Sequence, residues 1–251
     1  MIALALLLAA EAPAPALTAR QVVDLVVDGD PWGMADAEVV THGIMKDKHG
    51  STSELRFTSK AKRYAPPLSE TLVRFSEPPE LVGAGFLQMQ KQEGDDDRWL
   101  FLPELKRSRR ISGSLRSSSF MGTDYSFADI DKRDLRESSV KLMPDELLAG
   151  KYDCWHVVVN PTREDAEYSR LDVWIRKDNH MPVLFRMFDK AGDLLKILTA
   201  EEVRRIGGSW YITKSRMQNV REQHETQWIL ERVVPGGGRD ADYQLRALEK
   251  M

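Results

Sequence analysis

The sequence predicts a mainly β protein with a few added helices, whose antiparallel sheet curls or closes on itself. From about Ala37 onward, apolar and polar residues alternate with a period of two, as in strands with one buried face. Turn residues such as Gly94-Asp95 and Gly207-Gly208 separate these runs at short intervals. Consecutive hairpins form an antiparallel meander, and a sheet of about ten or eleven strands must curl or close because long sheets twist.

The start of the chain, residues 1–16, has the pattern of a secretory signal peptide, with an apolar core followed by small residues. Because no Lys or Arg precedes this core, a misassigned start and a short buried helix are alternatives. The run is too short to span a bilayer, and no later stretch approaches 18 apolar residues. No cysteine follows the run closely. We therefore expect a periplasmic chain without a lipid anchor or transmembrane segment, with residues 17–251 forming a single domain.

One helix and a series of strands follow from the local patterns. Thr18 and Gln21 have the capping-box spacing, and Gly29 and Pro31 end the apolar segment, which predicts a helix over 18–28. The alternation predicts strands at 55–58, 71–75, 86–89, 99–102, 155–159, 171–176, 183–188, 194–198, 210–214 and 226–233.

The segment 103–131 interrupts the hairpin rhythm and is too long for a simple turn, and such loops often carry function. Its basic run, with Arg107, Arg109 and Arg110, contains no acidic residue. Three interpretations are open: a solvated strand face, a surface that docks an acidic partner or an anionic lipid headgroup, and a nucleic-acid patch. The net charge of −3 disfavours nucleic acid as a partner.

Aromatic residues follow in the same segment, at Phe120, Tyr125 and Phe127. They could anchor the loop over the edge of the sheet. Alternatively, they could form a lid, because a carrier must cover an apolar lining when it is empty.

Several strands are apolar on both faces, as at 99–102 and at 171–176, where Trp174 opposes Val173 and Ile175. A sheet that is covered on one side only should not show this pattern. Either helices cover the second face or that face lines a cavity, and both can hold. The candidate cavity residues are Leu87, Met89, Trp99, Phe101, Phe120, Met121, Val173 and Ile175.

The motifs of common enzymes are missing from the sequence, which has no His-Glu-x-x-His, Gly-x-Ser-x-Gly, Walker A or Cys-x-x-Cys motif. Its five histidines fall in different segments, and Cys154 is the single cysteine. We expect no enzymatic activity, metal or cofactor. A hydrolase with an unrecognised site is a weaker alternative.

Three ordered motifs resemble the outer-membrane lipoprotein-sorting protein family. Residues 75–87, FSEPPELVGAGFL, are similar to its run F-x-x-P-x-x-x-x-G-T-x-F-L. Residues 98–111, RWLFLPELKRSRRI, resemble W-L-Y-L-P-x-x-x-R-x-R-R-I, and residues 119–130, SFMGTDYSFADI, resemble S-F-M-G-S-D-F-S-Y-E-D-L. The departures at Ala84, Phe101, Thr123 and Ala128 weaken any claim that one polar group in a motif is essential.

The resemblance implies a fold like that of the LolA and LolB carriers, an incomplete antiparallel β-barrel wrapped around a few helices and enclosing an apolar cavity. It further implies a carrier that binds a lipid or lipoprotein acyl chain for transport to the outer membrane. An RND/MMPL-type inner-membrane transporter is a possible partner on the same ground. The alternative is a non-enzymatic accessory subunit that docks on such an exporter and whose sheet interior is filled by side chains.

Overall fold

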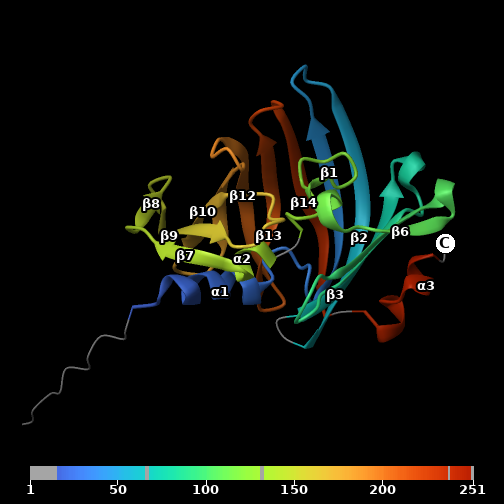
Figure 1. Cartoon of the computed structure of the whole chain (residues 1–251), viewed down its shortest axis with the longest axis horizontal. Helices are drawn as coiled ribbons and strands as arrows, with labels where there is room; N and C mark the ends of the chain where they lie inside the picture. Colours follow the sequence, from blue (N-terminus) through green and yellow to red (C-terminus); the bar gives the residue numbers. More distant parts are fainter. Residues whose placement is uncertain (1–15, 66–67, 131–132, 237, 250–251) are drawn as a thin grey trace, which may run out of the picture.

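The computed structural model describes residues 16–65, 68–130, 133–236 and 238–249, and Figure 1 shows their arrangement. The predicted signal segment 1–16 lies outside the described residues except for Ala16. Helix α1 (Ala19–Gly29) begins with the predicted capping box between Thr18 and Gln21. Asp30 follows its last residue and caps the helix in a left-handed conformation. No helix in the described part of the chain is long and apolar enough to cross a membrane.

A mainly β fold with an open antiparallel sheet, as predicted, is confirmed. The strands are β1 (Ala37–Lys46), β2 (Thr52–Ala65), β3 (Leu68–Glu77), β4 (Gly85–Met89), β5 (Asp97–Leu102), β6 (Arg107–Arg110), β7 (Ser138–Leu142), β8 (Glu146–Leu148), β9 (Tyr152–Pro161), β10 (Arg170–Arg176), β11 (Pro182–Phe188), β12 (Leu194–Ile206), β13 (Ser209–Asn219) and β14 (His224–Pro235). Strands β1, β6, β7 and β8 were not among the predicted runs. Strand β6 has no apolar residue, and β7 and β8 are too short to show a period of two.

The sheet consists of two meanders, not one. Its order is β6-β5-β4-β3-β2-β1-β14-β13-β12-β11-β10-β9-β7, with β8 beside β9. The first strand therefore lies in the middle, paired antiparallel with the last. Because β6 and β7 are at opposite edges, the chain between them must cross the sheet. We call residues 111–130 the crossing segment, and the face that they cover the inner face.

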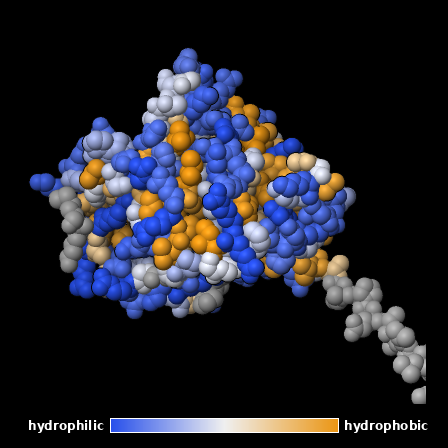
Figure 2. All heavy atoms as spheres, turned by 180° about the vertical axis from the view of Figure 1, so that it is seen from behind, coloured by the Kyte–Doolittle hydropathy of each residue, from blue (hydrophilic) through white to orange (hydrophobic). Residues whose placement is uncertain are grey.

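Both faces of the sheet are covered in part. The main core lies on the inner face and joins side chains of the sheet, helix α1 and the crossing segment. On the outer face, the 3-10 helix η4 (Asp240–Asp242) and helix α3 (Leu245–Leu248) bring Tyr243 and Leu248 against β3, β4 and β5. Seen from behind, hydrophobic residues reach the surface between hydrophilic ones (Figure 2). The strands that are apolar on both faces thus have apolar partners on each side of the sheet.

Candidate functional site

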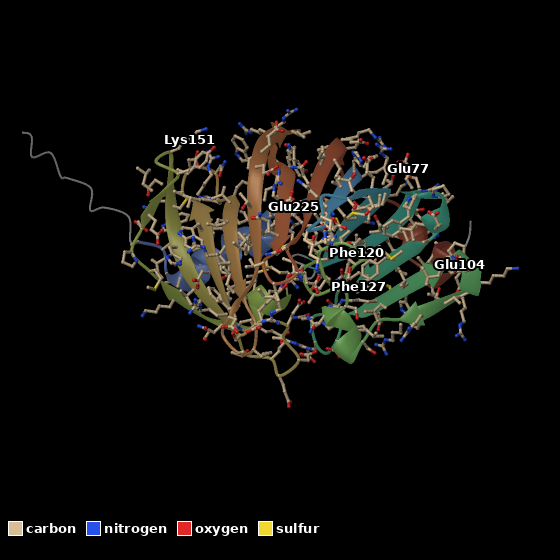
Figure 3. The ribbon with its side chains drawn as sticks, turned by 90° about the horizontal axis from the view of Figure 1, so that it is seen from above. Glu77, Glu104, Phe120, Phe127, Lys151 and Glu225 are labelled. Atoms are coloured by element: carbon tan, nitrogen blue, oxygen red, sulfur yellow. The ribbon has the colours of Figure 1, made fainter. Side chains whose placement is uncertain are left out.

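Aromatic side chains of the crossing segment fill much of the interior. Phe120 is 1% exposed, and its ring centroid lies 6.2, 5.7 and 5.8 Å from those of Phe57, Phe75 and Phe86. Phe127 packs on the same cluster, and Figure 3 shows both rings within the curl of the sheet. Of the two interpretations of these aromatics, anchoring at a sheet edge does not describe them. They lie over the inner face, as a lid would, but their side chains are buried deep in the core.

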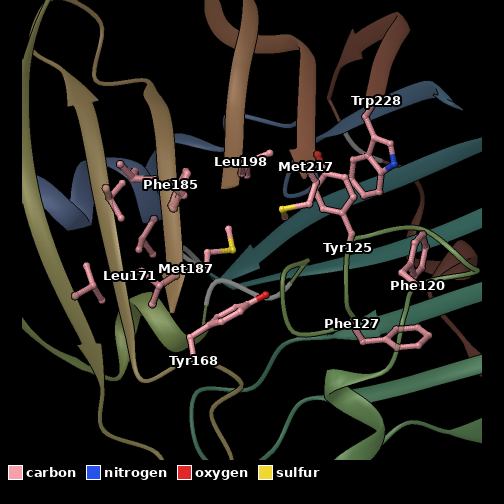
Figure 4. Packing of buried hydrophobic residues seen from close by; sticks show 14 of the residues in the cluster. Phe120, Tyr125, Phe127, Tyr168, Leu171, Phe185, Met187, Leu198, Met217 and Trp228 are labelled. Atoms are coloured by element: carbon pink, nitrogen blue, oxygen red, sulfur yellow. The ribbon is translucent and has the colours of Figure 1, made fainter. Parts of the chain in front are cut away.

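The middle of the crossing segment is attached to the C-terminal meander. Tyr125 stacks on Trp228 with 3.8 Å between ring centroids (Figure 4), and its hydroxyl lies 3.1 Å from the Ser215 hydroxyl. Burial raises the pKa of Tyr125 far above its usual range, so the phenol stays neutral. The Asp124 carboxylate lies 2.7 Å from His224 Nδ1 and accepts a hydrogen bond from Thr226 at 2.7 Å.

A buried ionic cluster holds the end of the segment. Lys196 Nζ lies 2.9 Å from Asp129 and 3.1 Å from Glu167, and Tyr168 donates to Asp129 at 2.7 Å. Ser126 donates to Glu167 at 2.5 Å. Burial and the neighbouring Asp129 raise the pKa of Glu167. Burial acts against the charged form of Lys196, but the two carboxylates raise its pKa overall, so it remains an ammonium.

An apolar cavity of about 90 Å³ lies between this segment and the C-terminal meander. Met217, Leu198 and Phe185 form part of its wall from the sheet, and Tyr125 and Tyr168 close it (Figure 4). The full lining is Trp32, Met34, Tyr125, Ala128, Asp129, Ile130, Leu135, Tyr168, Leu171, Phe185, Met187, Leu198, Met217 and Trp228. These residues come from distant parts of the chain. Tyr125 was predicted as part of a lid, residues 128–130 belong to the motif at 119–130, and most of the strand residues are members of the alternating runs.

A second groove, of about 260 Å³, lies on the other side of the crossing segment. It is lined by Leu100, Leu102, Leu105, Arg107, Arg109, Ile111, Leu115, Ser118, Ser119, Met121 and Phe127. The crossing segment therefore divides the inner face into two spaces.

Four of the predicted cavity residues lie elsewhere. Leu87, Met89, Trp99 and Phe101 face outward and belong to the cluster beneath the C-terminal segment. Strand alternation offers two apolar faces here, and the face with the larger side chains is the one that helix α3 covers.

The other predicted residues lie on the inner face. Val173, Ile175 and Phe120 are in the main core but do not line the cavity, whereas Met121 lines the second groove. Arg107 and Arg109 line this groove as well. Arg110 lies apart from them and pairs with Asp97 at 2.7 Å.

The Asp124–His224 pair resembles part of a hydrolytic site, as do the carboxylate–histidine pairs Glu146–His156 and Glu54–His42. It borders a polar groove that includes His224 and Glu225. Among the residues that the structure describes, no hydroxyl or thiol hydrogen-bonds to the other ring nitrogen of His224. The pair joins the crossing segment to β14. The residues that the structure describes contain no cluster of three or more His, Cys, Asp or Glu side chains that could hold a metal ion.

Comparisons with known proteins agree with this fold. A family model described as "Uncharacterized protein" matches residues 68–250. An outer-membrane lipoprotein-sorting protein domain from Vibrio parahaemolyticus is 25% identical, with a TM-score of 0.80 over 87% of this chain and 93% of that chain. A DUF1329 family protein from Desulfovibrio piger is 27% identical, with a TM-score of 0.83 over 92% of this chain and 99% of that chain.

A more distant structure shows the same fold. The LolA superfamily protein NE2245 from Nitrosomonas europaea is 16% identical, with a TM-score of 0.72 over 91% of this chain and 98% of that chain. The comparison with curated proteins gave no match.

Proposed function

The chain belongs to the family whose model matches residues 68–250, and it is similar in structure to a lipoprotein-sorting domain and to a LolA superfamily protein. On this basis we propose that it is a non-enzymatic periplasmic carrier. It holds a lipid or lipoprotein acyl chain against the inner face of the sheet, for transport to the outer membrane. The observation that carries this proposal is the apolar cavity beneath a segment that crosses an otherwise open sheet.

Loading requires the crossing segment to move. Small-molecule pockets usually measure about 300–1,000 Å³, so a space of about 90 Å³ holds only a fragment of an acyl chain. Backbone hydrogen bonds within the segment are local: Phe120 donates to Tyr125, Phe127 to Ser118 and Ala128 to Arg116. Two amides of the segment donate to the sheet, Ile111 to the Arg98 carbonyl and Asp124 to the Thr226 hydroxyl. Residues 112–130 can therefore withdraw without breaking the ladders between the strands.

The apolar terms of this exchange are of similar size. Exposing three aromatic side chains costs about 1.5–3 kcal/mol each, or roughly 5–9 kcal/mol together. Burying about 16 carbons at about 0.8 kcal/mol each returns on the order of 10 kcal/mol before ordering costs. Withdrawal must also separate Asp129 from Lys196 and Asp124 from His224, so release of the cargo restores these ion pairs together with the aromatic contacts.

A second candidate function is an accessory subunit that docks on an RND/MMPL-type exporter. The observation that favours it is the filled interior, where Phe120 and Phe127 occupy space that a cargo would need. In this case the crossing segment is a permanent part of the core, and the interior stays closed.

Lipid content separates the two functions. We expect protein purified from a periplasmic extract to yield acyl lipids by extraction and mass spectrometry, and the delipidated protein to take up a fluorescent fatty acid. Leu198→Trp places a larger side chain in the cavity and should reduce this uptake. Leu147→Trp, at an exposed position on β8, is the matched control and should not. Protein that is lipid-free and takes up no fatty acid would reject the carrier in favour of the accessory subunit.

A further inference from the structure

We propose that the second groove selects the cargo: it binds a single acyl chain with an anionic headgroup, which Arg107 and Arg109 hold. This inference rests on the proposed carrier function and specifies the class of lipid carried. The crossing segment separates this groove from the cavity against the C-terminal meander, so one chain could run through both when that segment withdraws.

The strand register places apolar and basic side chains next to each other. Leu100 is paired with Arg109, and Leu102 with Arg107, across β5 and β6. Side chains of such pairs project from the same face of a sheet. The two leucines therefore form an apolar floor, with the two guanidinium groups along its edge.

The crossing segment supplies the opposite wall, which is apolar as well, with Ile111, Leu115, Met121 and Phe127. A volume of about 260 Å³ is near the lower end of ligand pockets, which favours one acyl chain over a diacyl lipid. Leu105 lines the same groove and is 52% exposed. Its apolar side chain marks the open end, where a chain can enter from solvent.

The charge at the rim is uncompensated. Neither Arg107 nor Arg109 has an ion-pair partner among the described residues, and no acidic residue lines the groove. Arg110, on the same strand, is paired with Asp97. Two guanidinium groups two residues apart suit the oxygens of a carboxylate or phosphate, because each presents a planar fork of donors. An anionic headgroup above an apolar chain complements both parts of the groove.

A simpler role for these arginines is that their aliphatic stems cover the leucines and their charges protect an edge strand. The two roles differ in their dependence on the headgroup. Coverage of the floor gives no preference between a charged lipid and its neutral ester, whereas recognition of an anion does.

The test uses fluorescence titration of the full chain with 12-(9-anthroyloxy)stearate and its methyl ester. We expect wild type to bind the acid more tightly than the ester. The double variant Arg107→Gln/Arg109→Gln should bind the acid about tenfold more weakly and the ester with unchanged affinity. Arg110→Gln removes one positive charge from the same strand, outside the groove, and should behave as wild type.

Two results would overturn the proposal: equal affinity of wild type for acid and ester, or an equal loss of acid binding in Arg110→Gln. Leu198→Trp separates this failure from that of the carrier function. If the arginine variants bind like wild type but Leu198→Trp loses the probe, the carrier function stands and this headgroup site does not. If wild type binds neither probe, both proposals fail.

Discussion

Phe120 connects the crossing segment to the sheet, because its ring packs against three aromatic rings of β2, β3 and β4. Truncating a buried Phe to Ala costs about 3–5 kcal/mol. We expect Phe120→Ala to lower the free energy of unfolding by about this amount and to raise fatty-acid uptake, because less apolar surface is exposed when the segment withdraws. Urea denaturation and fluorescence titration measure the two effects.

Phe57→Ala is the matched control for this prediction. Phe57 is also 1% exposed and contacts Phe120, but it belongs to the sheet. It should cost a similar free energy of unfolding without increasing uptake. Equal uptake by both variants would indicate that any vacated volume binds the probe, and that withdrawal of the segment is not involved.

Glu167 makes the stability of the protein depend on pH. Burial and the nearby Asp129 raise its pKa in the folded state above the ordinary value of 4.5, so the folded state binds this proton more tightly than the unfolded state. Its stabilising contribution is therefore complete below pH 4.5 and is lost as the pH rises through the raised pKa.

Glu167→Gln should remove this dependence. We expect its free energy of unfolding, relative to wild type, to increase between pH 4.5 and neutral pH in a series of urea denaturations. Glu164→Gln, at an exposed neighbouring position, should follow the wild-type curve. A constant difference between Glu167→Gln and wild type across this range would show that the carboxyl has no raised pKa.

At the scale of elements, helix α3 determines which face of β4 and β5 is outside. Leu248 is fully buried against Leu87 and Phe101, and Leu245 on the same helix is 36% exposed. We expect Leu248→Ala to lower the free energy of unfolding by about 2–5 kcal/mol. Leu245→Ala should change it by no more than about 0.5 kcal/mol. Similar effects of the two substitutions in urea denaturation would mean that α3 does not stabilise this face.

Helix α3 also explains why only some of the residues predicted to line a cavity lie on the inner face. Within β5, Leu100 and Leu102 share one face while Trp99 and Phe101 share the other, and a period of two treats both faces alike. The choice between them depends on Tyr243 and a helix that lies more than a hundred residues away in sequence. Local patterns were sufficient for helix α1, whose cap and apolar face lie within a dozen residues.

The topology of the whole molecule depends on contacts that no local pattern contains. Hairpin spacing predicted a curled antiparallel sheet, but the pairing of β1 with β14 joins residues near opposite ends of the chain. The ionic cluster likewise depends on a contact between distant residues, since Asp129 and Lys196 are 67 residues apart in the sequence. The motif at 119–130 marked the crossing segment as distinctive without indicating that it enters the interior.

The crossing segment should detach from the sheet at a lower free energy than that at which the strands of the sheet separate. The crossing segment makes most of its backbone hydrogen bonds within itself, whereas β12, β13 and β14 are held by long ladders to neighbours on both sides. Native-state hydrogen exchange follows such sub-global openings. We expect the amides of Phe120, Phe127 and Ala128 to exchange well before those of β13, and to exchange faster still when palmitate is bound. If all of these amides exchange together at the global free energy of unfolding, with or without palmitate, the segment is a fixed part of the core and the interior does not open.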